Sequence, residues 1–323
     1  MLELPPLPDD LPWSLSAYLL LDGVSAANLA RRLHRWDNPV YCLYHGTRWH
    51  ELADISPCLV TLKGAGDSLL AYFQEHAALE WGYLLFSEAD ALALCKHWRR
   101  LLSVEQAEGV EVMPRIADPA VMHPLFDLAS QANSARWFGP VAHVCLPDGV
   151  AGVWRQHTRF EQARAEPQAY RLTDQELTAL GEVEFRNVVS DLIEHLQTHF
   201  PAFMANFPGP EGRQYVQTLA SEAYQQGFSS EQELVFYANV FGYLAGQPVI
   251  EHPDIAQLLA GTAAGGPLAR VERAAELAES RAADRQGGPL WLLNNHHHLK
   301  SVPTSRPRPR ASRTLVHPLG CVP

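Results

Sequence analysis

The sequence lacks the patterns that mark membrane insertion, secretion or disulfide-based folding. No apolar run approaches the ~18 residues needed to span a bilayer, and the first residues, MLELPPLPDDLPW, contain no Lys or Arg ahead of an apolar stretch. The five cysteines (Cys42, Cys58, Cys95, Cys145 and Cys321) are odd in number and widely spaced, without a C-x-x-C pair. We therefore expect reduced thiols in a cytoplasmic protein that has no signal peptide.

Catalytic signatures are also missing, since G-x-S-x-G, H-E-x-x-H, a Walker loop and G-x-G-x-x-G do not occur. Gly66-Asp67-Ser68-Leu69 spells the short motif of GDSL-type ester hydrolases, between a predicted strand and a predicted helix. That chemistry needs a base, yet the chain contains no D-x-x-H and no G-x-N-D. A hydrolase that uses Ser68 stays an alternative, and an ordinary helix cap at Asp67 or Ser68 is favoured.

The 15 histidines do not form a recognisable metal motif. His45 and His50 are five residues apart, His195 and His199 share a predicted helix face, and residues 296–298 are consecutive. No carboxylate pattern of a metalloenzyme accompanies any of them. We expect no metal and no cofactor.

Negative charge dominates the chain, which carries 25 Lys and Arg against 36 Asp and Glu, for a net charge of −11. Residues 300–323 contain five basic residues and no acidic one, so the first 299 residues carry about −16. An acidic body disfavours nucleic acid and an anionic membrane as the main partner. The basic, Pro-rich segment 285–323 is expected to be disordered.

Strands and helices alternate from residue 13 to residue 160, most densely between Trp81 and Val144. This pattern predicts an α/β domain with a mixed, partly parallel sheet and flanking helices, ended by a hairpin around residues 147–149. Residues 170–284 instead repeat apolar side chains at helical spacing, with capping boxes at Thr173 and Ser230. The fold class is therefore α/β followed by an α-helical C-terminal lobe.

Several residues in the α/β part are candidates for structural motifs. Asp22-Gly23 ends the first strand, and Asp118-Pro119 starts a helix because Asp caps free N–H groups and Pro fits the first turn. Arg115 is a candidate for a salt link or an acid–base pair with Asp118, and an ordinary strand-end Arg beside a cap Asp is favoured over both. The motif candidates are Asp22, Gly23, Arg115, Asp118, Pro119, Gly139 and Pro140.

Aromatic residues are the candidates for contacts with a partner protein. Trp137 precedes Phe138-Gly139-Pro140 and is expected to be partly exposed. Four aromatic residues of the helical lobe lie at the edge of the inferred core stripes and are candidate anchors, although a core position is favoured for most of them: Tyr215, Tyr224, Phe228 and Tyr237.

Seven short segments in order resemble the type VI secretion effector-adaptor family, also called Tap or TEC, whose domain is named domain of unknown function 4123. They are Tyr18–Gly23, Tyr44–Thr47, Pro57–Val60, Trp81–Ser87, Cys95–Leu102, Arg115–Pro119 and Phe138–Val141. The resemblance covers roughly residues 15–145. The chain departs from the family pattern at His45, Trp98, Pro114 and Ala117.

The resemblance implies a non-catalytic cytoplasmic adaptor or chaperone that binds a toxic effector and loads it onto the VgrG spike protein. It also implies that the α/β domain, which defines the family, meets VgrG, whereas the helical lobe holds the individual effector. A generic regulatory binding module is a further alternative. The residues alone support only the negative part of this interpretation, because they show no catalytic grouping.

Overall fold

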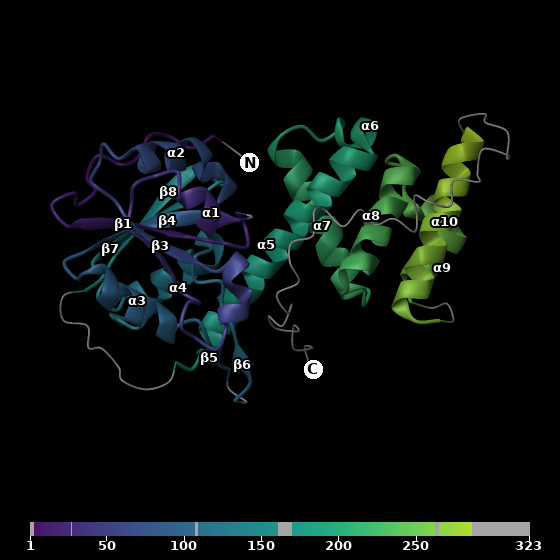
Figure 1. Ribbon diagram of the computed structural model, residues 1–323. Helices are drawn as coiled ribbons and strands as arrows, with labels where there is room; N and C mark the ends of the chain where they lie inside the picture. Colours follow the sequence, from purple (N-terminus) through teal and green to yellow (C-terminus); the bar gives the residue numbers. More distant parts are fainter. Residues whose placement is uncertain (1–2, 27, 107–108, 161–169, 262–264, 286–323) are drawn as a thin grey trace. The chain divides into compact units, whose positions relative to one another are not determined.

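The computed structural model describes residues 3–26, 28–106, 109–160, 170–261 and 265–285. Of the predicted disordered tail, Arg285 ends a helix, and residues 286–323 lie outside the described ranges. Two compact units make up the described chain, and they meet in sequence between Val183 and Glu184 (Figure 1). This boundary falls inside a single long helix, α5 (Asp174–His199). The α/β class with a helical C-terminal part is confirmed.

The first unit is built on a six-stranded sheet with the order β2-β3-β1-β4-β7-β8. A separate two-stranded ribbon pairs β5 with β6. The strands are β1 (Ser16–Leu21), β2 (Val40–Cys42), β3 (Cys58–Thr61), β4 (Gly82–Ser87), β5 (Val104–Glu105), β6 (Glu111–Val112), β7 (His143–Asp148) and β8 (Val153–Thr158). The last two form the predicted hairpin.

The predicted partly parallel pairing is wrong, because every ladder of the described sheet is antiparallel. The strand–helix–strand pattern that suggested parallel pairing is real for β3, α2 and β4. Both strands run antiparallel to β1 and hence parallel to each other, but β1 lies between them. The sequence pattern indicated the crossover and gave no sign of the inserted strand.

Helices cover both faces of this sheet (Figure 1). One face packs on α1 (Leu29–Leu33) and α2 (Ser68–His76), with Leu19, Val60 and Phe73 in its core. The other packs on α3 (Ala91–Arg100) and α4 (Pro119–Gln131), with Leu20 and Trp98 in its core. Two short 3-10 helices, η1 (His50–Ile55) and η2 (Ala77–Leu79), complete the unit. Strands buried on both faces explain why β1 and β4 read as continuous apolar runs.

The second unit contains only helices among its described residues. They are the end of α5, α6 (Pro201–Met204), α7 (Pro210–Gln225), α8 (Glu231–Leu244), η3 (Val249–Glu251), α9 (Pro253–Leu259) and α10 (Pro267–Arg285). Helix α10 is rich in Ala and in charged residues. Its small side chains Val271, Ala274, Ala275 and Ala278 are fully buried in the core of this unit.

Capping explains where several helices begin. Asp118 caps α4 by accepting a hydrogen bond from the Ala120 N–H, and Pro119 occupies the first turn, as predicted. Ser230 and Glu233 form the predicted capping box of α8. Asp90 caps α3 by accepting a hydrogen bond from the Ala93 N–H at 2.8 Å.

Candidate functional site

Three of the candidate motif residues, which come from two separate parts of the sequence, meet in one charged cluster. Asp22 directly follows β1, Arg115 lies between β6 and α4, and Asp118 is the N-cap residue of α4. The Arg115 guanidinium pairs with both carboxylates, and its Nη1 lies 2.9 Å from Asp118 Oδ2. Both carboxylates are almost fully buried.

The carboxylates of this cluster accept further hydrogen bonds from their own loops. Asp22 accepts from the backbone N–H groups of Val24 and Ser25, both at 3.1 Å, and from the Ser25 hydroxyl at 2.8 Å. Asp118 caps its helix with its other oxygen, Oδ1. Every carboxylate oxygen of the pair therefore has a donor within the chain.

The electrostatics favour a permanently charged arrangement. Burial opposes the charge of Arg115, but Asp118 and Asp22 outweigh that effect and raise the pKa of its guanidinium. The neighbouring Tyr44 has a pKa raised to about 12, first by burial and then by the negative charge of Asp22. The geometry therefore supports the salt link rather than the acid–base pair, and it fixes the end of β1 against the start of α4.

Gly23 lies beside this cluster and has no room for a side chain. A Cβ atom there would lie 2.4 Å from the backbone oxygen of Ser56. The loop after β1 therefore packs directly on the backbone that leads into β3.

Gly139 and Pro140 form a second close contact in the same unit. Gly139 has a φ of 53°, and a Cβ atom there would lie 2.2 Å from Nδ1 of His97. Ser87 donates to the Pro140 carbonyl at 2.7 Å, and Arg159 donates to the Gly139 carbonyl at 2.5 Å. This turn therefore connects α3 to the end of the sheet, consistent with a structural motif.

The expected exposure of Trp137 is wrong, because its side chain is fully buried. Its indole Nε1–H donates to Glu176 Oε1 at 2.7 Å, and its ring lies 4.3 Å from that of Tyr170. The Phe138-Gly139-Pro140 turn suggested a surface position, whereas the residues that cover Trp137 come from about 35 positions later in the chain. Trp137 is a core residue of the first unit.

The four aromatic candidates of the helical unit differ in exposure. Phe228 and Tyr237 are buried in its core, and their rings lie 5.6 Å apart. Tyr215 and Tyr224 are only partly buried. Tyr215 stacks on Phe207 at 4.3 Å between ring centroids. Of these four residues, therefore, only Tyr215 and Tyr224 are exposed enough to contact a partner.

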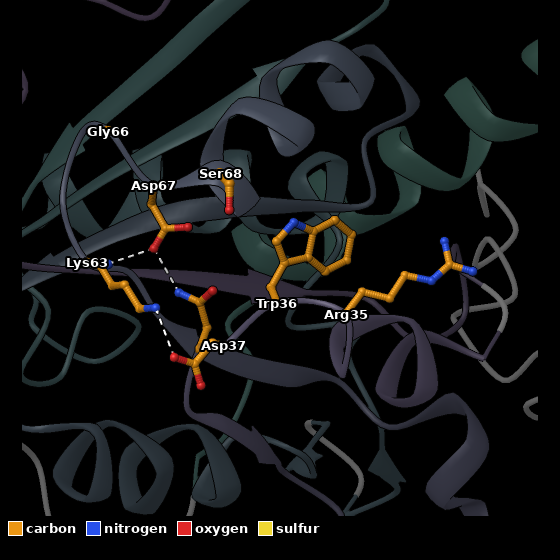
Figure 2. Close-up of a pocket in the computed structure, with 8 residues that line it drawn as sticks. Arg35, Trp36, Asp37, Lys63, Gly66, Asp67 and Ser68 are labelled. Atoms are coloured by element: carbon orange, nitrogen blue, oxygen red, sulfur yellow. Dashed lines mark hydrogen bonds and ion pairs between the residues drawn. The ribbon is translucent and has the colours of Figure 1, made fainter.

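The Gly66-Asp67-Ser68 motif lines an open cleft of roughly 550 Å³ (Figure 2). The carboxylate of Asp67 accepts hydrogen bonds from the Lys63 N–H at 2.8 Å, the Asn38 side chain at 2.7 Å and the Leu69 N–H at 2.8 Å. These bonds close the loop between β3 and α2 and cap the helix, as favoured from the sequence.

Ser68 itself has no partner that fits nucleophilic catalysis. The other side chains around the cleft are Arg35, Trp36, Asp37, Asn38 and Lys63, with no histidine among them. Within the described ranges no hydrogen bond joins the Ser68 hydroxyl to a histidine or a carboxylate. The residues that line the cleft therefore do not form a Ser–His pair of the kind that activates a serine nucleophile.

The histidines show no metal centre in the part of the chain that the structure describes. His195 contacts Asn239 through Nε2 at 2.6 Å, and its ring lies 4.6 Å from that of His199. His123 and His157, which the sequence did not single out, lie 2.9 Å apart between ring nitrogens. Residues 296–298 lie outside the described residues.

Two exposed apolar side chains were also missed by the sequence interpretation. Leu92 in α3 is 68% exposed, and Ile250 in η3 is 84% exposed. Burying such a side chain against a partner stabilises a complex by roughly 1.5–3 kcal/mol. The hydrophobic periodicity of a short segment gives no signal for such residues, because it identifies only the face of the helix that packs on the core.

No helix within the described ranges is long and apolar enough to cross a bilayer.

Comparisons with known proteins found one matching family model and one similar protein. Residues 17–136 match the family model described as domain of unknown function DUF4123. Accessory protein VasW of Vibrio cholerae serotype O1 (strain ATCC 39315 / El Tor Inaba N16961) is 29% identical over 275 residues, which cover 83% of this chain and 90% of that relative. No solved structure matches the chain. The DUF4123 match contains Asp22, Arg115 and Asp118, so the charged cluster belongs to the part that the family shares.

Proposed function

We propose that the chain, whose residues 17–136 match the DUF4123 family that its sequence motifs predicted, is a cytoplasmic adaptor of a type VI secretion system. In this role it acts as a chaperone that binds a toxic effector and loads it onto the VgrG spike, without catalysing a reaction. The observation that carries the proposal is the family match across residues 17–136, extended over most of the chain by the similarity to an accessory protein.

Separate hydrophobic cores support a division of labour between the two units. The α/β unit has one core on each face of its sheet, in residues 11–145 and 18–183, and the helical unit has its own core in residues 189–278. The family match lies within the α/β unit, where it ends before β7 and β8, and it does not reach the helical unit. We assign the shared spike protein to the α/β unit and the individual effector to the helical unit.

Leu92 is our candidate for the spike contact. It lies on α3 in line with Lys96 and Arg100, which follow at intervals of four residues and are also exposed. An apolar side chain next to two positive charges suits a partner surface with an apolar pocket and acidic surroundings.

Ile250, Tyr215 and Tyr224 are our candidates for the effector contact. Ile250 supplies an exposed apolar side chain, and the two tyrosines supply partly exposed rings on α7. Aromatic and branched apolar anchors of this kind suit an amphipathic or apolar segment of another chain.

Two substitutions in the full-length protein test this assignment. Ile250→Asp should weaken binding of the purified effector at least tenfold and leave VgrG binding unchanged, whereas Leu92→Asp should do the reverse. Binding is measured by biolayer interferometry, and both variants should keep the parental melting temperature because both side chains are exposed. If wild-type protein binds neither partner, the adaptor proposal fails. If the two variants exchange their effects, the proposed roles of the units are reversed.

The hydrolase alternative is tested separately with p-nitrophenyl esters. We expect no activity above that of buffer, since no histidine lines the cleft beside Ser68. Ester cleavage that Ser68→Ala abolishes would instead support a hydrolase.

A further inference from the structure

The antiparallel pairing of β2 with β3 places two free thiols opposite each other. Cys42 pairs with Cys58, and their Sγ atoms lie 3.5 Å apart. The next pair along the ladder is hydrogen-bonded, because the Leu43 N–H donates to the Pro57 carbonyl at 2.9 Å. Since hydrogen-bonded and non-hydrogen-bonded pairs alternate, the two cysteines occupy a non-hydrogen-bonded pair. Their Cα atoms are then roughly 4.5 Å apart, within the range of about 4.4–6.8 Å that a disulfide requires.

The two thiols differ in accessibility and acidity. Cys42 is partly exposed on the edge strand, whereas Cys58 is completely buried. A hydrogen bond from Cys58 lowers the pKa of Cys42 to about 7, although burial opposes this. The pKa of Cys58 is raised by its interaction with Cys42 and by burial. Cys42 is therefore the thiol that a reagent reaches first, and it is the better nucleophile at neutral pH.

We propose that Cys42 and Cys58 form a redox-sensitive site that a small disulfide, such as glutathione disulfide, converts to an intrachain disulfide. The Cys42 thiolate attacks one sulfur of the reagent, forms a mixed disulfide and releases one thiolate. Cys58 then loses its proton and attacks Cys42 Sγ, releasing the second thiolate. Two protein thiols are oxidised and one reagent disulfide is reduced to two thiols.

The site differs from the other described cysteines of the chain. Cys95 and Cys145 are buried free thiols, and burial is the main cause that raises the pKa of each. The structure gives neither of them a hydrogen bond to another cysteine. Only the pair on β2 and β3 combines an accessible thiol with a second thiol in reach among the described residues.

The disulfide would join the edge strand to the interior of the sheet. β2 is three residues long, and in the reduced protein Arg99 also holds it through a 3.0 Å hydrogen bond to the Leu43 carbonyl. A covalent link here closes a short loop, which restricts the unfolded chain and stabilises the fold. The proposal does not depend on the adaptor function.

The test uses full-length protein in a Cys321→Ser background, because Cys321 lies outside the described residues. The protein is incubated with glutathione disulfide at pH 7.5, quenched with acid and mapped by mass spectrometry. We expect the loss of two free thiols, a linked peptide pair containing Cys42 and Cys58, and a melting temperature that rises and returns after reduction. Cys145→Ser is the matched control and should behave like the parent.

A second variant tests the order of attack. Cys58→Ser removes the resolving thiol and should trap glutathione on Cys42. An unchanged thiol count in the parent, or a disulfide that links Cys42 to another cysteine, would overturn the proposal. So would glutathione that accumulates on Cys95 or Cys145 while Cys42 stays free. The mapping of the parent decides the question even if the variant fails to fold.

Discussion

At the scale of single residues, the backbone around Gly23 tolerates no side chain. Gly23→Ala should destabilise the protein by about 1–3 kcal/mol, because its Cβ would lie 2.4 Å from a backbone oxygen that cannot rotate away. Gly66→Ala is the control, since a Cβ there meets nothing within 4 Å. Urea denaturation of both variants measures the difference. Equal stabilities would show that the loop after β1 can shift freely.

The Asp67 carboxylate predicts a dependence of stability on pH. Burial would raise the pKa of Asp67, but the hydrogen bonds from Lys63, Asn38 and Leu69 outweigh it and lower the pKa. A depressed folded-state pKa stabilises the protein fully above the unfolded value of roughly 3.9, and this contribution is lost as the pH falls through the folded value.

Asp67→Asn tests this dependence because its amide removes the charge and one acceptor. The variant should be less stable than wild type at pH 7, and the difference should shrink as the pH falls below about 4. Chemical denaturation at several pH values between 7 and 3 gives both curves. A constant difference would mean that the charge of Asp67 does not contribute.

At the scale of secondary-structure elements, local chemistry predicted helix starts and strand cores well. Asp118-Pro119 and Ser230 begin helices for reasons contained in four or five adjacent residues. Pairing could not be predicted in the same way. The insertion of β1 between β3 and β4 depends on contacts between distant segments, and so does the burial of Trp137 beneath Tyr170 and Glu176.

Glu176, in the first turn of α5, accepts several hydrogen bonds from the first unit. Glu176 accepts from the Trp137 indole at 2.7 Å, the Tyr170 hydroxyl at 2.6 Å and the Thr173 N–H at 2.8 Å. Glu176→Ala should lower the free energy of unfolding by at least about 2 kcal/mol, because it leaves buried donors without a partner. Glu182→Ala, an exposed position on the same helix, should have little effect.

Urea unfolding followed by tryptophan fluorescence measures both substitutions in α5. The fluorescence of Trp137 should also change in the native state of Glu176→Ala, because the indole N–H loses its acceptor. If Glu176→Ala were as stable as Glu182→Ala, the capping box would not anchor this helix.

At the scale of the whole molecule, α5 takes part in both cores. Leu180 and Val183 belong to the core of the α/β unit, whereas Val189, Leu192 and Leu196 belong to that of the helical unit. The sequence predicted domains of residues 13–160 and 170–284 from the change in periodicity. Periodicity locates the switch from strands to helices, but it does not reveal that one helix supplies side chains to two cores.

A series of fragments tests how the chain divides. Residues 1–160 lack Tyr170, Leu172, Leu180 and Val183, all of which are buried in the first core. A fragment of residues 1–199 should therefore unfold cooperatively at a clearly higher temperature than residues 1–160, because removing these side chains exposes the apolar surface that they cover.

A fragment of residues 1–173 keeps Tyr170 and Leu172 without α5 and should melt between the other two. Residues 174–285, which retain the whole of α5, should fold, whereas a fragment that starts after Leu196 should not, because it loses Val189, Leu192 and Leu196 from the second core. Circular dichroism and calorimetry of the fragments provide the measurement. Identical melting of residues 1–160 and 1–199 would show that the α/β unit is complete without α5. In that case the sequence-based boundary near residue 160 would be the physical one.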